Sequence, residues 1–157
     1  AYFTHLRDSP AQIRVILGDA RVSLAGSAET YDLLFLDAFS SDAVPIHLLT
    51  REAFELYLRR LSPRGLIVIH TSSRMVELKP ILAALAADLD LAGAAKSSSG
   101  PDTAEDEFTS RYAAMSRDPA LIQKLIENLG WNPLSDHADS SRVWTDQRSS
   151  LLDVLGH

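Results

Sequence analysis

Short apolar runs alternate with longer amphipathic segments along this chain, and the two patterns predict different elements. The β-branched run at residues 13–17 predicts a strand. The continuous apolar run at 32–36 predicts a strand buried on both faces, as in a parallel sheet. The run at 66–69 predicts another buried strand that ends at His70, and residues 111–115 predict a further strand.

Apolar residues recur at helical spacing between residues 48 and 61, which predicts an amphipathic helix. Thr50 offers an N-cap for this helix and Glu52 an acidic first turn. The sequence Ser-Pro-Arg-Gly at 62–65 ends it. Further helices are expected at 21–25, 76–91 and 118–129, and a polar loop is expected at 97–106.

Strands that alternate with helices predict an α/β fold with a mostly parallel sheet flanked by helices. The 157 residues suit a single domain, 1–157, with its own core, and 46% hydrophobic residues argue against disorder. No apolar run approaches the roughly 18 residues that span a bilayer, and no signal peptide is visible. We therefore predict a soluble, cytoplasmic domain without a membrane partner.

Composition and charge limit the kinds of site and partner that the chain can have. The chain has no cysteine, which excludes disulfides, thiolate metal sites and a cysteine nucleophile. A net charge of −6 disfavours nucleic acid as a partner and suits a cationic substrate. The histidines lack metal-ligand spacing, so no metal is expected. Ser40 and Ser41 near His47 could suggest a hydrolase, but the Gly-x-Ser-x-Gly motif is missing.

Polar residues stand at the ends of three predicted strands, namely Asp19, Asp37 and His70. Ligands of open parallel sheets bind outside the carboxyl ends of the strands, so these side chains would converge on one crevice. Each residue also has a structural interpretation. Asp19 could cap the turn into the next helix, and His70 could be a hydrogen-bonded residue at a strand end.

Three stretches carry a more specific pattern: Gly-Asp-Ala-Arg at 18–21, the run from Tyr to Pro at 31–45, and His-Leu-Leu-Thr-Arg-Glu-Ala-Phe at 47–54. Leu-x-Pro-x-Gly at 61–65 and Trp-Thr-Asp at 144–146 accompany them. Together they resemble the spermidine synthase-like family of the class I S-adenosylmethionine-dependent methyltransferase superfamily, most closely its bacterial transporter-fused group. The resemblance implies a Rossmann-like fold truncated at the N-terminus, because only the C-terminal half of the family pattern is matched.

Site residues follow from this resemblance. The Gly-Asp motif implies that Asp19, with Ala20 beside it, binds the adenine of decarboxylated S-adenosylmethionine or of S-adenosylmethionine. Asp37 would lie beside the reacting centre, where it would contact the S-adenosyl nucleotide, bind the acceptor amine and take its proton. Asp42 or Ser40 would correspond to an acidic residue of the family's gate loop. His70 stands where such enzymes often carry Gln, and we assign it to substrate binding.

Other family features have no match. Residues 1–18 contain no Gly-x-Gly pattern, and the Tyr-Pro pair of the polyamine pocket is missing between Lys96 and Thr109. Three hypotheses therefore stay open. The domain is an aminopropyltransferase-type domain that binds an S-adenosyl nucleotide and is active or degenerate, a non-catalytic α/β interaction module, or a methyltransferase on an unknown acceptor.

The resemblance also bears on assembly, because the family's sheet places its first two strands between the third and the fourth. Without those two, the strand at 13–17 must pair directly with the strand at 32–36, detach, or join a sheet in another chain. An unpaired apolar edge favours a covering partner, so we predict a homodimer or a companion subunit.

Overall fold

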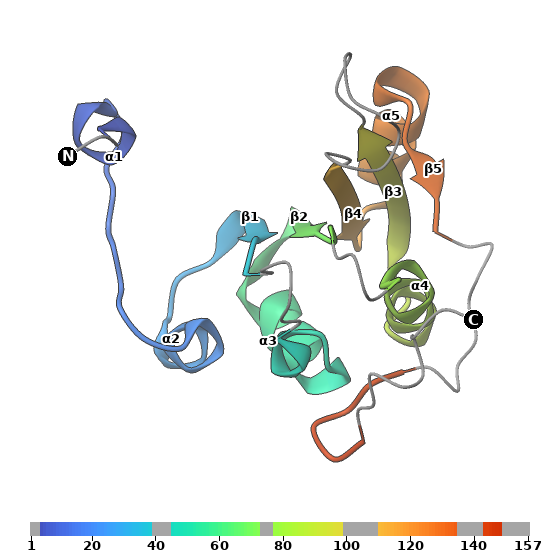
Figure 1. The fold of residues 1–157 in the computed structure, drawn as a ribbon, viewed down its shortest axis with the longest axis horizontal. Coiled ribbons are helices and arrows are strands. Elements are labelled where there is room, and N and C mark those ends of the chain that lie inside the picture. Colours follow the sequence, from blue (N-terminus) through green and yellow to red (C-terminus); the bar gives the residue numbers. More distant parts are fainter. Residues whose placement is uncertain (1–3, 39–44, 73–76, 99–109, 135–142, 149–157) are drawn as a thin grey trace.

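The computed structural model describes residues 4–38, 45–72, 77–98, 110–134 and 143–148 (Figure 1). Its helices are α1 (His5–Asp8), α2 (Ala20–Gly26), α3 (Arg51–Arg60), α4 (Lys79–Asp88) and α5 (Pro119–Leu129), with a 3-10 turn η1 (Ile46–Leu48). Its strands are β1 (Tyr31–Leu36), β2 (Leu61–His70), β3 (Ala92–Ser98), β4 (Ser110–Ser116) and β5 (Asn132–Pro133).

The five strands form one sheet in the order β1-β2-β4-β3-β5 (Figure 1). β1 and β2 are parallel, whereas β2–β4, β4–β3 and β3–β5 are antiparallel. The α/β fold is as predicted, but the prediction of a mostly parallel sheet is wrong. The chain leaves β2 through α4 and enters β3 two strand positions away, which leaves the position between β2 and β3 open. β4 then returns in the opposite direction and fills that position.

Helices cover both faces of the sheet, with α3 and α4 on one side and α5 on the other (Figure 1). Successive side chains of β2 point to opposite faces of the sheet and so pack against the helices on both sides. Ile67 and Ile69 are fully buried in the core cluster that α3 and α4 line, while Leu66 and Val68 pack into the cluster around Ile122 of α5. The two-sided burial predicted for residues 66–69 is therefore present.

α3 forms as its sequence predicts. The Thr50 hydroxyl accepts a hydrogen bond from the Ala53 backbone N–H at 3.3 Å, which caps the helix. Phe54 and Tyr57 on its inner face are buried, with ring centroids 5.5 Å apart. Burial raises the pKa of the Tyr57 phenol to about 12. Its hydroxyl donates to the Leu48 carbonyl at 3.0 Å, so this buried polar group is satisfied.

β1 departs from its prediction. Leu34 and Leu36 pack against the main core, but Leu33 and Phe35 on the opposite face are 54% and 51% exposed. Burial on both faces was wrong for this strand, because no described helix covers the face that carries Leu33 and Phe35. β1 is also the edge of the sheet in the described part of the chain.

Residues 13–17 do not form the predicted strand. They run as extended chain between α1 and α2, away from the sheet (Figure 1). Val15, Ile16 and Leu17 are 67%, 59% and 91% exposed. Within this chain the segment is detached and does not pair with the strand at 31–36, because no described strand supplies the hydrogen-bonding partner that a strand requires. Pairing with a sheet in another chain stays a prediction.

The second half of the chain differs from prediction mainly at β3. The helix expected at 76–91 is shorter and ends at Asp88, and the chain then forms β3, which the sequence analysis missed. Ala and Gly dominate this strand and have low β propensity. Of the loop expected at 97–106, Ser97 and Ser98 belong to β3, and the remainder lies outside the described residues. β4 and α5 form where predicted. The described helices are all too short or too polar to traverse a lipid bilayer.

Gly65 in β2 is required for packing, because a Cβ at this position would overlap the Leu61 side chain. We expect Gly65→Ala to lower the free energy of unfolding by about 1–3 kcal/mol, as measured by urea titration. The matched control is Gly26→Ala at the end of α2, where a Cβ would meet no atom within 4 Å. The control should be neutral or slightly stabilising, and equal stability of the two variants would contradict this account.

Candidate functional site

Asp37 and His70 lie together at the carboxyl ends of two parallel neighbours. Asp37 follows β1, and His70 is the last residue of β2. The His70 Nδ1 and Asp37 Oδ1 atoms are 2.7 Å apart. The Asp37 side chain is 55% exposed, and its Oδ2 atom has no hydrogen-bond partner among the described residues. A carboxylate oxygen is therefore presented to solvent beside the sheet.

The second nitrogen of the His70 ring also has a hydrogen-bond partner. Its Nε2 atom lies 2.7 Å from the Ser72 hydroxyl oxygen, and that oxygen accepts the Arg111 backbone N–H at 2.8 Å. An ionised carboxylate only accepts hydrogen bonds, so the contact with Asp37 requires a proton on His70 Nδ1. The hydrogen bonds thus form a chain from the β4 backbone through Ser72 and His70 to Asp37.

Two aromatic rings border this chain. Tyr112 pairs with His70 in the β2–β4 register, and the rings stack at 5.0 Å with an interplanar angle of 29°. Phe35 lies 6.3 Å from Tyr112, centroid to centroid. Sequence analysis missed Tyr112, because placing it beside His70 requires knowing that β4 pairs with β2. Phe35 could have been predicted from the sequence, because side chains alternate along a strand and residues 35 and 37 therefore point to the same face.

Asp19 is the N-cap of α2, and Ala20 is the first residue of that helix. The Asp19 Oδ1 atom accepts the Val22 backbone N–H at 2.9 Å, and this hydrogen bond holds the pKa of Asp19 below its ordinary value. Oδ2 lies 3.4 Å from His47 Nε2. No hydrogen bond or ion pair between described residues joins Asp19 to Asp37, so the two aspartates belong to separate clusters.

The other two predicted site residues, Ser40 and Asp42, lie outside the described residues. Within the described ranges, no group of three or more histidine and carboxylate side chains is arranged to hold a metal ion.

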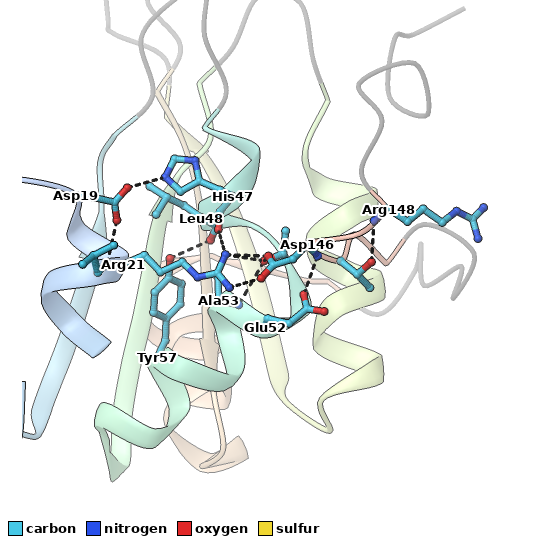
Figure 2. Close-up of polar contacts among 12 residues, drawn as sticks. Asp19, Arg21, His47, Leu48, Glu52, Ala53, Tyr57, Asp146 and Arg148 are labelled. Carbon is cyan, nitrogen blue, oxygen red and sulfur yellow. Dashed lines mark hydrogen bonds and ion pairs between the residues drawn. The ribbon is translucent and has the colours of Figure 1, made fainter. Parts of the chain in front are cut away.

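We call Asp19 and its partners Val22 and His47 the Asp19 cluster. Beside it, Arg21 and Asp146 form a bidentate ion pair (Figure 2). Arg21 Nη1 donates to Oδ1 at 2.8 Å and Nη2 donates to Oδ2 at 2.5 Å. The Thr50 hydroxyl donates to Oδ1 at 2.7 Å. These contacts, with the Arg21 hydrogen bonds first, lower the pKa of Asp146 to about 2. We call this set of three residues the Arg21–Asp146 clamp.

The clamp belongs to a wider contact between the segment 143–148 and the start of α3. The Arg51 N–H donates to the Trp144 carbonyl at 2.8 Å, and Glu52 accepts the Asp146 N–H at 2.9 Å. Arg21 also donates to the His47 carbonyl at 3.0 Å. Arg21 and Asp146 are 125 positions apart, so no local pattern could reveal the clamp.

Comparison with known proteins places this geometry in a family. Residues 2–87 match a family model described as S-adenosyl-L-methionine-dependent methyltransferase. A "Probable polyamine aminopropyl transferase" of Bifidobacterium longum is 33% identical over 63 residues, 40% of this chain and 14% of the relative. A "Polyamine aminopropyltransferase" of Vibrio vulnificus is 43% identical over 63 residues, 38% of this chain and 21% of the relative. The matched segments span about a fifth or less of these relatives' length.

A solved structure supports the fold. The probable spermidine synthase from Corynebacterium glutamicum superposes with a TM-score of 0.53, over 87% of this chain and 55% of that one. Sequence identity in this superposition is 17%, so the likeness concerns the fold alone.

The clamp predicts a pH-dependent contribution to stability. The folded-state pKa of Asp146 is about 2 against an ordinary 3.8, so the contribution is present above about pH 4 and lost as the pH falls through 2. We expect Asp146→Asn to lower the free energy of unfolding at pH 7 by about 1 kcal/mol, since solvent screens this half-exposed pair. The deficit should shrink between about pH 4 and pH 2 in denaturant titrations.

Asp90→Asn is the matched control, because Asp90 is exposed and its side chain makes no hydrogen bond or ion pair with another described residue. Its backbone has a positive φ of 54°, which asparagine tolerates. Equal stability of Asp146→Asn and Asp90→Asn at pH 7 would rule out the clamp as a stabilising contact.

Proposed function

Because this chain belongs to the S-adenosyl-L-methionine-dependent methyltransferase family, we propose that it is a transferase domain that binds an S-adenosyl nucleotide and serves an amine acceptor. The observation that carries the proposal is the Asp37 carboxylate beyond β1, with one oxygen on His70 and the other without a partner in the described part of the chain. An ammonium group is the natural ligand of such a carboxylate. The partial matches to two polyamine aminopropyltransferases favour aminopropyl transfer over methyl transfer.

In the proposed reaction, Asp37 binds the ammonium group of the acceptor and takes one of its protons. The amine lone pair then attacks the carbon next to the sulfonium. The new carbon–nitrogen bond forms as the carbon–sulfur bond breaks, and the sulfur leaves as a neutral thioether. Decarboxylated S-adenosylmethionine supplies the activated aminopropyl group. The half-exposed Phe35 ring beside Tyr112 offers an apolar and aromatic wall that would exclude water from an alkyl amine.

One of the two carboxylate oxygens of Asp19 is placed to bind the nucleoside end of the ligand. One of its oxygens is used by the helix cap, and the other faces His47 at 3.4 Å, where an adenine amino group could serve as donor instead. Its position at the start of α2 agrees with the role that the Gly-Asp motif implies. Ala20 follows directly, so its small side chain would leave room for the base.

Titration calorimetry with decarboxylated S-adenosylmethionine, S-adenosylmethionine and methylthioadenosine tests this function. Asp19→Asn keeps an oxygen that can cap α2 but lacks the charge, and we expect it to weaken nucleotide binding by about 10-fold. Asp37→Asn should bind the nucleotide like the parent and lose at least about 100-fold in transfer to a diamine. Asp90→Asn should change neither quantity. Preference for S-adenosylmethionine over its decarboxylated form would favour methyl transfer instead.

A second function is supported by a different observation. The edge of β1 is unpaired among the described strands, and the detached segment 13–17 exposes four apolar side chains, those of Ile13, Val15, Ile16 and Leu17. Both features suit a non-catalytic interaction module whose sheet is completed by a homodimer partner or a companion subunit. The two functions are alternatives, because Asp37 directly follows β1, the strand whose edge is exposed, and a non-catalytic module would not use its carboxylate for transfer.

Light scattering of the purified chain tests the homodimer. If the exposed segment makes the contact, the parent should have twice the monomer mass at micromolar concentration, and Val15→Asp should be monomeric. Leu129→Asp is the control, since Leu129 is 54% exposed on α5 and should leave the mass unchanged. A monomeric parent would exclude the homodimer and leave a companion subunit to be sought.

A further inference from the structure

His70 engages protein groups with both of its ring nitrogens, Nδ1 with Asp37 and Nε2 with Ser72, each at 2.7 Å. Its side chain is 23% exposed and its ring stacks on Tyr112. A ring held on both nitrogens and one face cannot rotate to meet a ligand without breaking these contacts. This arrangement differs from the substrate-binding role that the sequence suggested for His70.

We propose that His70 is a positioning residue, which fixes the Asp37 carboxylate so that its second oxygen faces the acceptor amine. The proposal rests on the role of Asp37 in the proposed function. Asp37 follows the edge strand β1 and is 55% exposed, so its side chain would otherwise sample several rotamers. The hydrogen bond from His70 Nδ1 selects one of them.

The support behind His70 comes from the antiparallel strand β4. Ser72 accepts the Arg111 N–H at 2.8 Å, and the next backbone contact, from the Thr71 N–H to the Arg111 carbonyl, measures 2.7 Å. The tyrosine that stacks on His70 follows Arg111 directly. The backbone of β4 thus fixes the orientation of Asp37 through the hydrogen-bonded side chains of Ser72 and His70. Precise placement of a reacting group is worth orders of magnitude in rate, which is why such support matters.

Two substitutions at His70 separate its two contacts. His70→Asn retains a donor near the Nδ1 position and loses the group that faces Ser72. His70→Gln retains a group near the Nε2 position and loses the donor to Asp37. We expect His70→Asn to keep kcat/KM for the amine within about 3-fold of the parent and His70→Gln to lower it at least about 10-fold. Nucleotide affinity should be unchanged in both, because the Asp19 cluster is separate.

Asp90→Asn is the control, since Asp90 is exposed and makes none of these contacts. It should leave kcat/KM for the amine unchanged. Equal losses in His70→Asn and His70→Gln would overturn the positioning role, because a purely structural histidine would not distinguish the two contacts.

A readout independent of activity separates this inference from the proposed function. Nitrogen-15 NMR of the imidazole should show a proton on Nδ1 of His70, and Asp37→Ala should remove the signature of its hydrogen bond. A neutral ring protonated only on Nε2 would overturn the inference. The Nδ1 signature in a folded protein without transfer or amine binding would support the geometry and reject the proposed function alone.

Discussion

The parallel pairing of β1 with β2 is the constraint on which the candidate site depends. Parallel neighbours end on the same edge of a sheet, so the residues that follow them meet whatever their separation in sequence. Asp37 and His70 are 33 positions apart and form a direct hydrogen bond for this reason. The core residues on β2 hold the pairing in place, because Ile67 and Ile69 are buried against α3 and α4. The chemistry at the strand ends therefore depends on packing several residues away.

The Asp19 cluster is held by a different set of contacts. α2 has no fully buried residue and packs only Leu24 against the main core among its described side chains, so polar groups supply much of its attachment to the rest of the molecule. Arg21 at its start joins Asp146, and Arg60 of α3 donates to the Leu24 and Ala25 carbonyls at its end. These carbonyls are among those that a helix leaves without internal partners. A helix attached in this way depends on solvent and on ionic conditions more than α3 or α4 does.

The sequence predicted what depends on local patterns and missed what depends on pairing. α3 with its Thr50 cap and α5 after Asp118 follow from periodicity and capping residues, which act within a few positions. Asp37 and His70 were predicted correctly as strand-end residues because the end of an apolar run in the sequence marks the end of a strand. The pairing of β4 with β2 brings Arg111 to Ser72 over 39 positions, and the clamp joins Arg21 to Asp146 over 125 positions. No local signal encodes these contacts or the stacking of Tyr112 on His70. The apolar run at 13–17 predicts a strand and does not form one, because β propensity describes a side chain's suitability for a sheet, not the presence of a neighbouring strand.

The position of β4 between β2 and β3 also sets an order of assembly. β2 and β3 cannot be joined in one sheet until the chain that follows both of them has returned, so the middle of the sheet closes after its flanks exist. Ser72 and Arg111 are 39 positions apart, and closing a loop of that length carries an entropic cost before any contact repays it. The serine, the imidazole and the carboxylate thus become aligned only when β4 is inserted between β2 and β3. The hydrogen bonds from Arg111 to Asp37 are therefore a marker of sheet closure, because they form only once its middle strand is in place.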